Sequence, residues 1–294
     1  VPKPIDFTVR PIAGLRDFHS LQKADANIKT QSVAEGLLIS HDVPGSCKLL
    51  VNCREAVFEE DPQWWYKFLY RADRERGQDC IEDLFAPGFF KYRIDSPTKL
   101  ILWANLSGDY EAGRFVLPDI EQVTGQLSGC HNDVIEPAKN DKKLQTLYLA
   151  ADQFVARRNL GGKAMSTILA GFPWFADWGR DAFISLPGLL LATRRFAEAK
   201  SVLVTFARAV VNGMIPSRFD DYSSEVHFNS VDSSLWFINA AFAYFHASGD
   251  RRTFREELLP VIISVINSYQ HGTQFGIHAD DDGLIMAGDA STQL

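Results

Sequence analysis

Two different spacings of apolar residues divide the sequence into two parts. In roughly the first 115 residues, short apolar runs at 36–40, 47–52 and 99–106 are bounded by Gly, Pro, Ser and Asp, which is the pattern of β-strands. The segment 61–76 differs, because it begins with Asp-Pro and places its apolar residues near the helical repeat. We expect a short helix there.

After about residue 140 the apolar positions follow helical spacing instead. The pattern predicts five helices, with breaks at Asn212-Gly213 and at Gly249, and with Pro260 either kinking the last helix or marking a late start. No strand pattern separates them, which favours antiparallel helical pairs. The predicted helices cover 144–158, 180–194, 197–211, 230–247 and 253–269.

The order of these patterns predicts a chain of two domains, β first and α second. A β-sandwich-like N-terminal domain is expected over 1–115. Residues 116–140 are expected to connect it to a helical domain over 141–294.

Composition and charge limit the classes of partner that the protein is expected to bind. The 294 residues are 46% hydrophobic and 23% charged, which is typical of a globular protein, and the net charge is −7. A nucleic acid or an anionic membrane surface would favour a basic protein, so neither is expected as the main partner, and a neutral ligand suits the chain better. No apolar run reaches the length of a membrane span, and the start does not read as a signal peptide.

The four cysteines, Cys47, Cys53, Cys80 and Cys130, form no CxxC pair and have no His at metal-ligand spacing. We interpret them as free thiols in a reducing compartment, and we expect a cytoplasmic protein. P-loop, Rossmann, zinc and GxSxG patterns are missing, so we predict no cofactor and no metal.

The loop at 171–181, GFPWFADWGRD, concentrates residues that suit a sugar site just before a helix. Trp174 or Trp178 offers a flat apolar face on which a sugar ring can stack. Arg180 and Asp181 can present donors and an acceptor to neighbouring hydroxyls, although an acid at a helix start is also favoured by the helix dipole. Asp177 would serve as a helix N-cap as well as a site residue.

A second group of residues lies at 213–237, where Asp232 opens a helix and Trp236 follows one turn later on the same face. A general acid must hold a proton at working pH, and a helix N-terminus opposes this. Burial against Trp236 and Phe228, or a second carboxylate nearby, would have to overcome that effect. From the residues alone, Asp232 is as well explained as an ordinary acid at a helix start.

Glycosidases mostly use a pair of carboxylates across the scissile bond, and this chain offers several. The acidic run before Gly283 is better explained as a solvated turn, because it lacks the ligand spacing of an EF-hand. The candidate carboxylates are Asp177, Asp181, Asp220, Asp221, Glu225, Asp232, Asp280, Asp281 and Asp282.

Three stretches, taken in order, resemble one protein family. GFPWFADWGRDAFISLPGL, GMIPSRF and NSVDSSLWF are similar to the C-terminal part of glycogen debranching enzymes, the amylo-α-1,6-glucosidase family. RPIAGLRDFHSL and CIEDLFAPGFF, nearer the start, resemble the β domain that precedes it in bacterial members.

The resemblance implies an (α/α)6 barrel with a pocket at one end, and hydrolysis of α-1,6 branch linkages with inversion. It implies that Asp232 is the general acid. It also implies an α-glucan partner such as glycogen, limit dextrin or a maltooligosaccharide. The residues expected to bind it are Trp174, Asp177, Trp178, Arg180, Asp181, Arg218 and Trp236.

The chain departs from the family pattern at its ends. The barrel needs twelve helices and about five are predicted, so we expect a fragment whose general base, a Glu, lies beyond Leu294. The acid alone should then give little turnover.

Two other functions fit the same residues. One is another (α/α)6-barrel α-glucosidase, similar to glucoamylase or trehalase. An enzyme of this kind would prefer α-1,4 or α,α-1,1 bonds to α-1,6 bonds. The other is a glucan-binding module without catalysis, which would still bind maltooligosaccharides.

Overall fold

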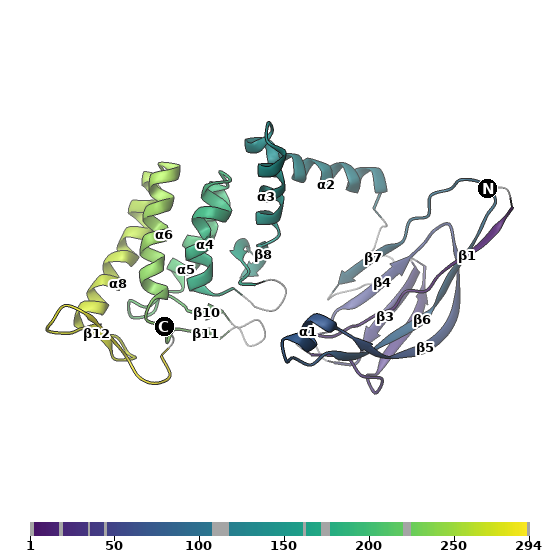
Figure 1. The fold of residues 1–294 in the computed structure, drawn as a ribbon, viewed down its shortest axis with the longest axis horizontal. Coiled ribbons are helices and arrows are strands. Elements are labelled where there is room, and N and C mark those ends of the chain that lie inside the picture. The colour runs from purple at the N-terminus through teal and green to yellow at the C-terminus, as the bar shows by residue number, and fades with distance from the viewer. Residues whose placement is uncertain are drawn as a thin grey trace. The chain divides into compact units, whose positions relative to one another are not determined.

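The computed structural model describes residues 3–17, 20–34, 36–43, 46–107, 118–160, 163–171, 177–219 and 225–292. The chain forms two compact units, Val1–Val123 and Thr124–Leu294 (Figure 1). The division falls inside the segment 116–140 that we expect to connect two domains. That segment contains helix α2 (Ile120–Ile135) and a 3₁₀ turn, η1 (Glu136–Ala138).

The first unit contains two antiparallel sheets (Figure 1). The three-stranded sheet has the order β1-β6-β5, with β1 at Ile5–Val9, β6 at Ile81–Ile94 and β5 at Val57–Leu69. The four-stranded sheet has the order β2-β3-β4-β7, with β2 at Ile28–Val33, β3 at Gly36–His41, β4 at Lys48–Asn52 and β7 at Trp103–Ser107.

One apolar core joins the two sheets. Phe90 of β6 is buried with Leu37 and Ile39 of β3 and with Val51 of β4. Burial on one face of each sheet is what the short apolar runs predict. The strands expected at 36–40, 47–52 and 99–106 are confirmed, although the last begins at Trp103.

The predicted helix at 61–76 is wrong. Strand β5 continues to Leu69, and only Arg71–Glu75 is helical, as α1. The reason is visible in the pairing of β5 with β6, whose register shifts between Glu60 and Gln63 and again between Trp65 and Phe68. These bulges break the strict alternation of a strand and so imitate helical spacing in the sequence.

The second unit confirms the existence of the five predicted helices, with shorter bounds. Gly249, at φ 68°, ends the fourth in the left-handed conformation that favours glycine. Pro260 does not mark a late start, because it directly follows the π-helical turn Phe254–Leu258 in a helical run that is continuous from Arg251 to His271. These helices are α3 (Lys142–Asp152), α4 (Gly179–Leu186), α5 (Phe196–Arg208), α6 (Ser233–Ser248) and α8 (Leu259–His271).

Three shorter elements complete this helical framework. Pro187–Leu191 (η2) and Phe254–Leu258 (η3) are π-helical turns, and α7 is Arg251–Thr253. None of the helices in the described ranges combines the length and the apolarity that a bilayer crossing requires.

Strands do separate the helices, contrary to expectation. The predicted helix 144–158 ends at Asp152, and a hairpin follows. The hairpin buries Ile168 in the helical core, and Ser166 N–H donates to Ser201 Oγ of α5 at 2.8 Å, so tertiary packing outweighs local helical spacing. The hairpins are β8 (Val155–Leu160) with β9 (Lys163–Ile168), β10 (Arg218–Phe219) with β11 (Val226–His227), and β12 (Ile277–Ala279) with β13 (Ile285–Ala287).

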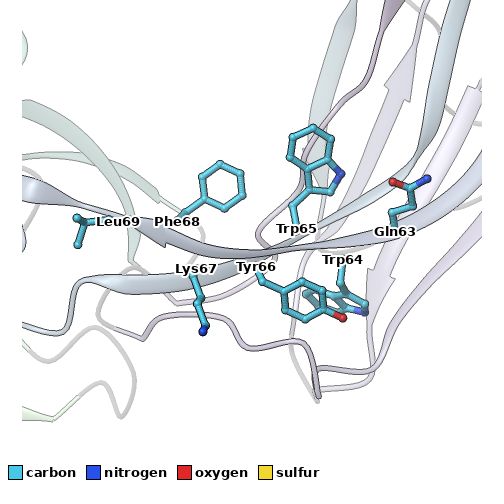
Figure 2. A pocket seen from close by; sticks show the side chains of 7 residues that line it. All are labelled: Gln63, Trp64, Trp65, Tyr66, Lys67, Phe68 and Leu69. Atoms are coloured by element: carbon cyan, nitrogen blue, oxygen red, sulfur yellow. The ribbon is translucent and has the colours of Figure 1, made fainter.

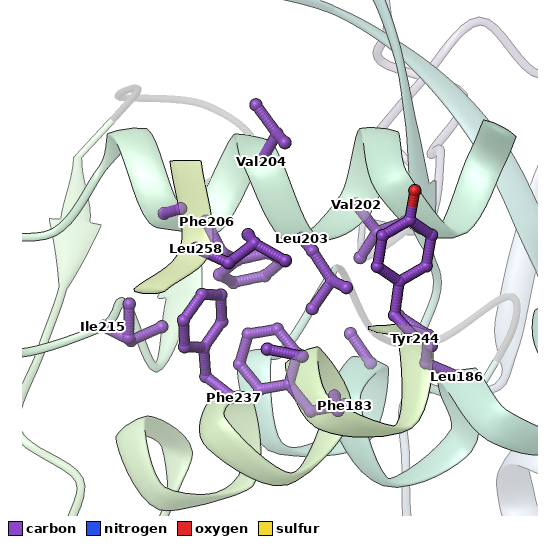
Figure 3. Close-up of a cluster of buried hydrophobic side chains, with 14 of the residues drawn as sticks. Phe183, Leu186, Val202, Leu203, Val204, Phe206, Ile215, Phe237, Tyr244 and Leu258 are labelled. Atoms are coloured by element: carbon purple, nitrogen blue, oxygen red, sulfur yellow. The ribbon is translucent and has the colours of Figure 1, made fainter. Parts of the chain in front are cut away.

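Aromatic rings join three helices at the centre of the second unit (Figure 3). The Phe183 ring of α4 lies 4.8 Å from that of Phe206 on α5 and 5.5 Å from that of Phe237 on α6. Edge-to-face contacts of this kind fix orientation as well as burying area. They hold α4 and α6 against each other, and the first residues of these two helices carry the candidate site.

Candidate functional site

The start of α4 is joined to the segment before β10 through its backbone. Gly179 N–H donates to Ser217 O at 2.8 Å, and Trp178 forms a β-bridge with Arg218. A Cβ atom on Gly179 would lie 2.4 Å from Pro216 O, which no real side chain tolerates. Glycine is therefore needed for the close approach that brings Trp178 and Arg218 side by side.

The start of α6 is fixed by two hydrogen bonds, one buried and one partly buried. Ile215 N–H donates to Ser234 Oγ at 2.9 Å, and the Tyr269 hydroxyl of α8 donates to Val231 O at 2.6 Å. Burial raises the pKa of Tyr269. Both helix starts are thus anchored to the segment 214–219.

Arg180 and Asp232 meet between these two helix starts. Arg180 Nε lies 2.8 Å from Asp232 Oδ2, and the two side chains are 36% and 28% exposed. Ser230 Oγ donates to the other oxygen, Oδ1, at 3.0 Å. Asp232 is the N-cap residue of α6, as expected, but its side chain makes no capping hydrogen bond. The carboxylate is oriented by a cation and a hydroxyl and still faces solvent.

Arg218 is held between an aromatic ring and an imidazole. Its Cζ lies 5.4 Å from the centre of the Trp178 ring, and its Nη2 lies 3.1 Å from His227 Nε2. A guanidinium can only donate, so Nε2 of His227 is the acceptor in this hydrogen bond. Nothing in the sequence singles out His227, because its role depends on the pairing of β10 with β11.

Asp177 does not cap α4, contrary to expectation. The N-cap residue is Trp178, and the Asp177 side chain is only 2% exposed. Asp177 Oδ2 accepts a hydrogen bond from Thr167 Oγ1 of β9 at 2.8 Å. A buried donor on the neighbouring hairpin, the Thr167 hydroxyl, takes the Asp177 carboxylate away from the local cap, and Asp177 fixes the backbone that leads into Trp178.

The remaining predicted residues are placed as follows. Asp181 is exposed in the first turn of α4. Trp236 is 38% exposed on α6, where its N–H donates to Asp232 O at 2.8 Å. Trp174, Asp220 and Asp221 lie outside the described residues.

The acidic run at 280–282 forms the predicted turn between β12 and β13. Gly283 N–H donates to Asp280 O at 2.9 Å, and Asp280 N–H donates to Leu284 O at 2.8 Å. Within the described ranges, no group of three His, Cys, Asp or Glu side chains is placed to hold a metal ion. All four cysteines are free thiols.

Comparison with known proteins matches both parts of the chain to one kind of enzyme. Residues 1–101 match the family described as glycogen debranching enzyme N terminal, and residues 149–294 match amylo-alpha-1,6-glucosidase. The chain belongs to the glycogen debranching family. The resemblance seen in the sequence motifs is thereby confirmed.

Within the debranching family, a glycogen debranching enzyme of Saccharomyces cerevisiae (strain ATCC 204508 / S288c) is 33% identical over 123 residues. The aligned region is 39% of this chain and 8% of the yeast protein. The amylo-alpha-1,6-glucosidase match, over 149–294, contains every predicted site residue.

Proposed function

We propose that the second unit carries the α-1,6-glucosidase site of a debranching enzyme, with an α-glucan as its substrate. The observation that supports this most directly is the ion pair between Arg180 and Asp232 at the starts of α4 and α6. It sets a solvent-facing carboxylate beside a cation, in a part of the chain that matches amylo-alpha-1,6-glucosidases. This is a suitable place to receive a sugar and protonate its leaving oxygen.

Asp232 is the proposed general acid, which gives its proton to the oxygen of the scissile bond. A carboxylate paired with a guanidinium is ionised, so the acid form requires that the pair loosen. A glucose hydroxyl that accepts from Arg180 would compete for the N–H donors that now face Asp232. Substrate binding and protonation of Asp232 would then favour each other.

The proposed binding residues supply both kinds of hydrogen-bonding group. Arg180 and Arg218 donate, while Asp181 accepts at the exposed first turn of α4. Trp178 and Trp236 offer ring surfaces, with Trp178 already held by Arg218. Because two cations and two carboxylates balance around the site, a neutral sugar suits it better than a charged ligand.

We further propose that the helical unit is part of an (α/α)6 barrel and that the reaction inverts the anomeric centre. Inversion needs a second carboxylate that activates water on the other face of the sugar, roughly 6.5–9.5 Å from the acid. An inverting reaction at an α-linkage gives β-glucose as its first product.

The test uses the full-length protein as its gene encodes it, with a phosphorylase limit dextrin as substrate. Asp232→Asn should lower the rate of glucose release by about 100- to 10,000-fold, which is the usual contribution of general acid catalysis. Asp281→Asn is the matched control, because it makes the same change in an exposed turn, and it should leave the rate unchanged.

Three results would contradict the proposal in different ways. Full activity in Asp232→Asn would remove the acid assignment. Release of α-glucose as the first product, followed by NMR, would exclude inversion. Faster cleavage of α-1,4 than of α-1,6 bonds would favour a glucoamylase-like enzyme instead.

A further inference from the structure

The three-stranded sheet of the first unit carries exposed aromatic residues on strand β5. Residues 63–69 line an open hollow of about 530 Å³ (Figure 2). Trp65 is 43% exposed and Tyr66 is 64% exposed. In the order β1-β6-β5, strand β5 is an edge of the described sheet. Large exposed rings at such an edge indicate a binding surface more often than a folding requirement.

A bulge gives these side chains their arrangement. Trp65 pairs with Leu84, but the next pair is Phe68 with Glu82, so β5 has one extra residue between them. Lys67 adopts φ 60°, and its N–H donates to Asp83 Oδ1 at 2.9 Å. Figure 2 shows Trp65 and Phe68 on one side of the strand and Tyr66 and Lys67 on the other. The bulge therefore presents aromatic rings in more than one direction around the edge.

Trp64 anchors this region to the sheet. Its ring lies 5.3 Å from that of Phe85 on β6, and the residue is half-buried. The Gln63 amide donates to Asp61 Oδ2 at 2.8 Å. The exposed rings thus project from a strand whose neighbouring side chains are already fixed, which lowers the entropy lost on binding.

The edge is poorly suited to receive another β-strand. Pro62 lacks an N–H group, and the register of β5 is interrupted on both sides of Gln63–Trp65. Lys67 adds a charge and a left-handed backbone. These are features that prevent edge-to-edge pairing of strands.

An anionic partner is also disfavoured. The chain has a net charge of −7, and the nearby acids Glu59 and Asp61 are already paired with Lys91 and Arg10. A nucleic acid would therefore gain little attraction from the chain as a whole. A neutral ligand with flat apolar faces and many hydroxyls needs neither a free strand edge nor a positively charged surface.

We infer that Trp65 and Tyr66, here called the aromatic edge, bind internal glucose units of an α-glucan. Their rings would stack on the C–H faces of the sugars, while Lys67 can donate to hydroxyls. This inference rests on the proposed function, which supplies the α-glucan. The aromatic edge lies in the first unit, so it is a second glucan site that holds the polymer rather than cleaving it. Two sites on one polymer raise the effective concentration of chain ends.

The experiment uses β-cyclodextrin, a closed ring of glucose units without a non-reducing end. It can occupy a surface that recognises internal units, but it presents no terminal glucose to the candidate catalytic site. Calorimetry on the full-length protein should show binding that weakens by about tenfold or more in the double variant Trp65→Ala/Tyr66→Ala. Asp232→Asn should bind like the unchanged protein.

Phe7→Ala is the matched control. Phe7 is an aromatic residue that is 41% exposed on β1, the opposite edge strand of the same sheet. Its loss should leave cyclodextrin binding unchanged. If the double variant does not fold, Tyr66→Ala alone replaces it, because Tyr66 is the more exposed ring.

The outcomes separate this inference from the proposed function. The aromatic edge would be overturned if the protein did not bind cyclodextrin, or if a folded Tyr66→Ala or double variant bound it as tightly as the unchanged protein does. Glucose release from a short branched oligosaccharide would still test the catalytic proposal. Conversely, cyclodextrin binding that depends on Trp65 and Tyr66, without any glucose release, would support the aromatic edge and contradict the catalytic proposal.

Discussion

Arg180 Nε lies 2.8 Å from Asp232 Oδ2, although the two residues are 52 positions apart (232 − 180). Each belongs to the start of a different helix, and both starts are hydrogen-bonded to the segment 214–219. The pair is partly exposed, so its contribution to folding stability is small, about 0–1 kcal/mol. Its position therefore matters more for a ligand than for the fold.

Replacing Arg180 should separate activity from stability. Arg180→Ala removes the charge-assisted hydrogen bonds that Arg180 is proposed to donate to the glucose hydroxyls. Such bonds are worth about 1.5–3 kcal/mol, so kcat/KM should fall by about 10- to 150-fold. The urea midpoint should change little. Arg252→Ala is the control, since Arg252 also pairs with a carboxylate, Glu256 at 3.0 Å, but on an exposed surface. A loss of stability in Arg180→Ala that matches the loss of activity would mean that Arg180 is structural.

Gly179 should not tolerate a side chain. A Cβ atom there would lie 2.4 Å from the backbone oxygen of Pro216, so Gly179→Ala must push α4 away, at a cost of about 1–3 kcal/mol. Activity should fall as well, because Arg180 follows directly. In Gly188→Ala nothing lies within 4 Å of the new Cβ, and stability should stay the same or rise by up to about 1 kcal/mol. Urea unfolding of both variants checks this, and equal stabilities would refute the packing argument.

The sequence predicts the elements whose apolar spacing agrees with their packing. The α5 and α6 helices bury one regular face against the same core, and the breaks at Asn212-Gly213 and Gly249 have positive φ, which the residue types favour. The strands β3 and β4 are equally regular. At these positions the local apolar pattern and the tertiary contacts favour the same secondary structure.

Prediction failed where a tertiary contact opposed the local pattern. The bulges of β5 imitate helical spacing, and β8 is a strand because its hairpin packs on α5. Asp177 looks like an N-cap in sequence, but its carboxylate is bound by Thr167 from another strand. His227 carried no signal at all, because only the β10–β11 pairing brings it to Arg218.

His227 should position Arg218 through one hydrogen bond. His227→Phe removes the acceptor that faces Nη2 at 3.1 Å, and a hydrogen bond from a charged donor is worth about 1.5–3 kcal/mol. We expect KM for a branched oligosaccharide to rise by about 10- to 150-fold, with a smaller change in kcat. His227→Gln keeps an acceptor and should recover much of the loss. Equal KM values for Phe and Gln variants would show that the hydrogen bond is not what matters.

Tyr244, which is buried in the core of the second unit (Figure 3), forms a pair with the partly exposed Asp250 that concerns stability rather than the site. The Tyr244 hydroxyl donates to Asp250 Oδ2 at 2.8 Å, and Thr253 donates to both carboxylate oxygens. The hydrogen bonds from Thr253 hold the pKa of Asp250 below its usual range. Burial, followed by the bond to Asp250, raises the pKa of Tyr244 to about 12.

This raised pKa predicts a loss of stability in alkaline solution. An unfolded tyrosine has a pKa of about 10, so between about pH 10 and 12 the folded state keeps a proton that the unfolded state releases. Stability from Tyr244 is therefore complete below pH 10 and falls by up to about 3 kcal/mol as the pH rises to 12. Urea unfolding from pH 8 to 12 should show a shallower decline in Tyr244→Phe, while the buried Tyr269 keeps part of the slope. The lost hydrogen bond gives a constant offset that is already present at pH 8, so only the difference in slope reports ionisation. Parallel curves for the two proteins would contradict the assignment.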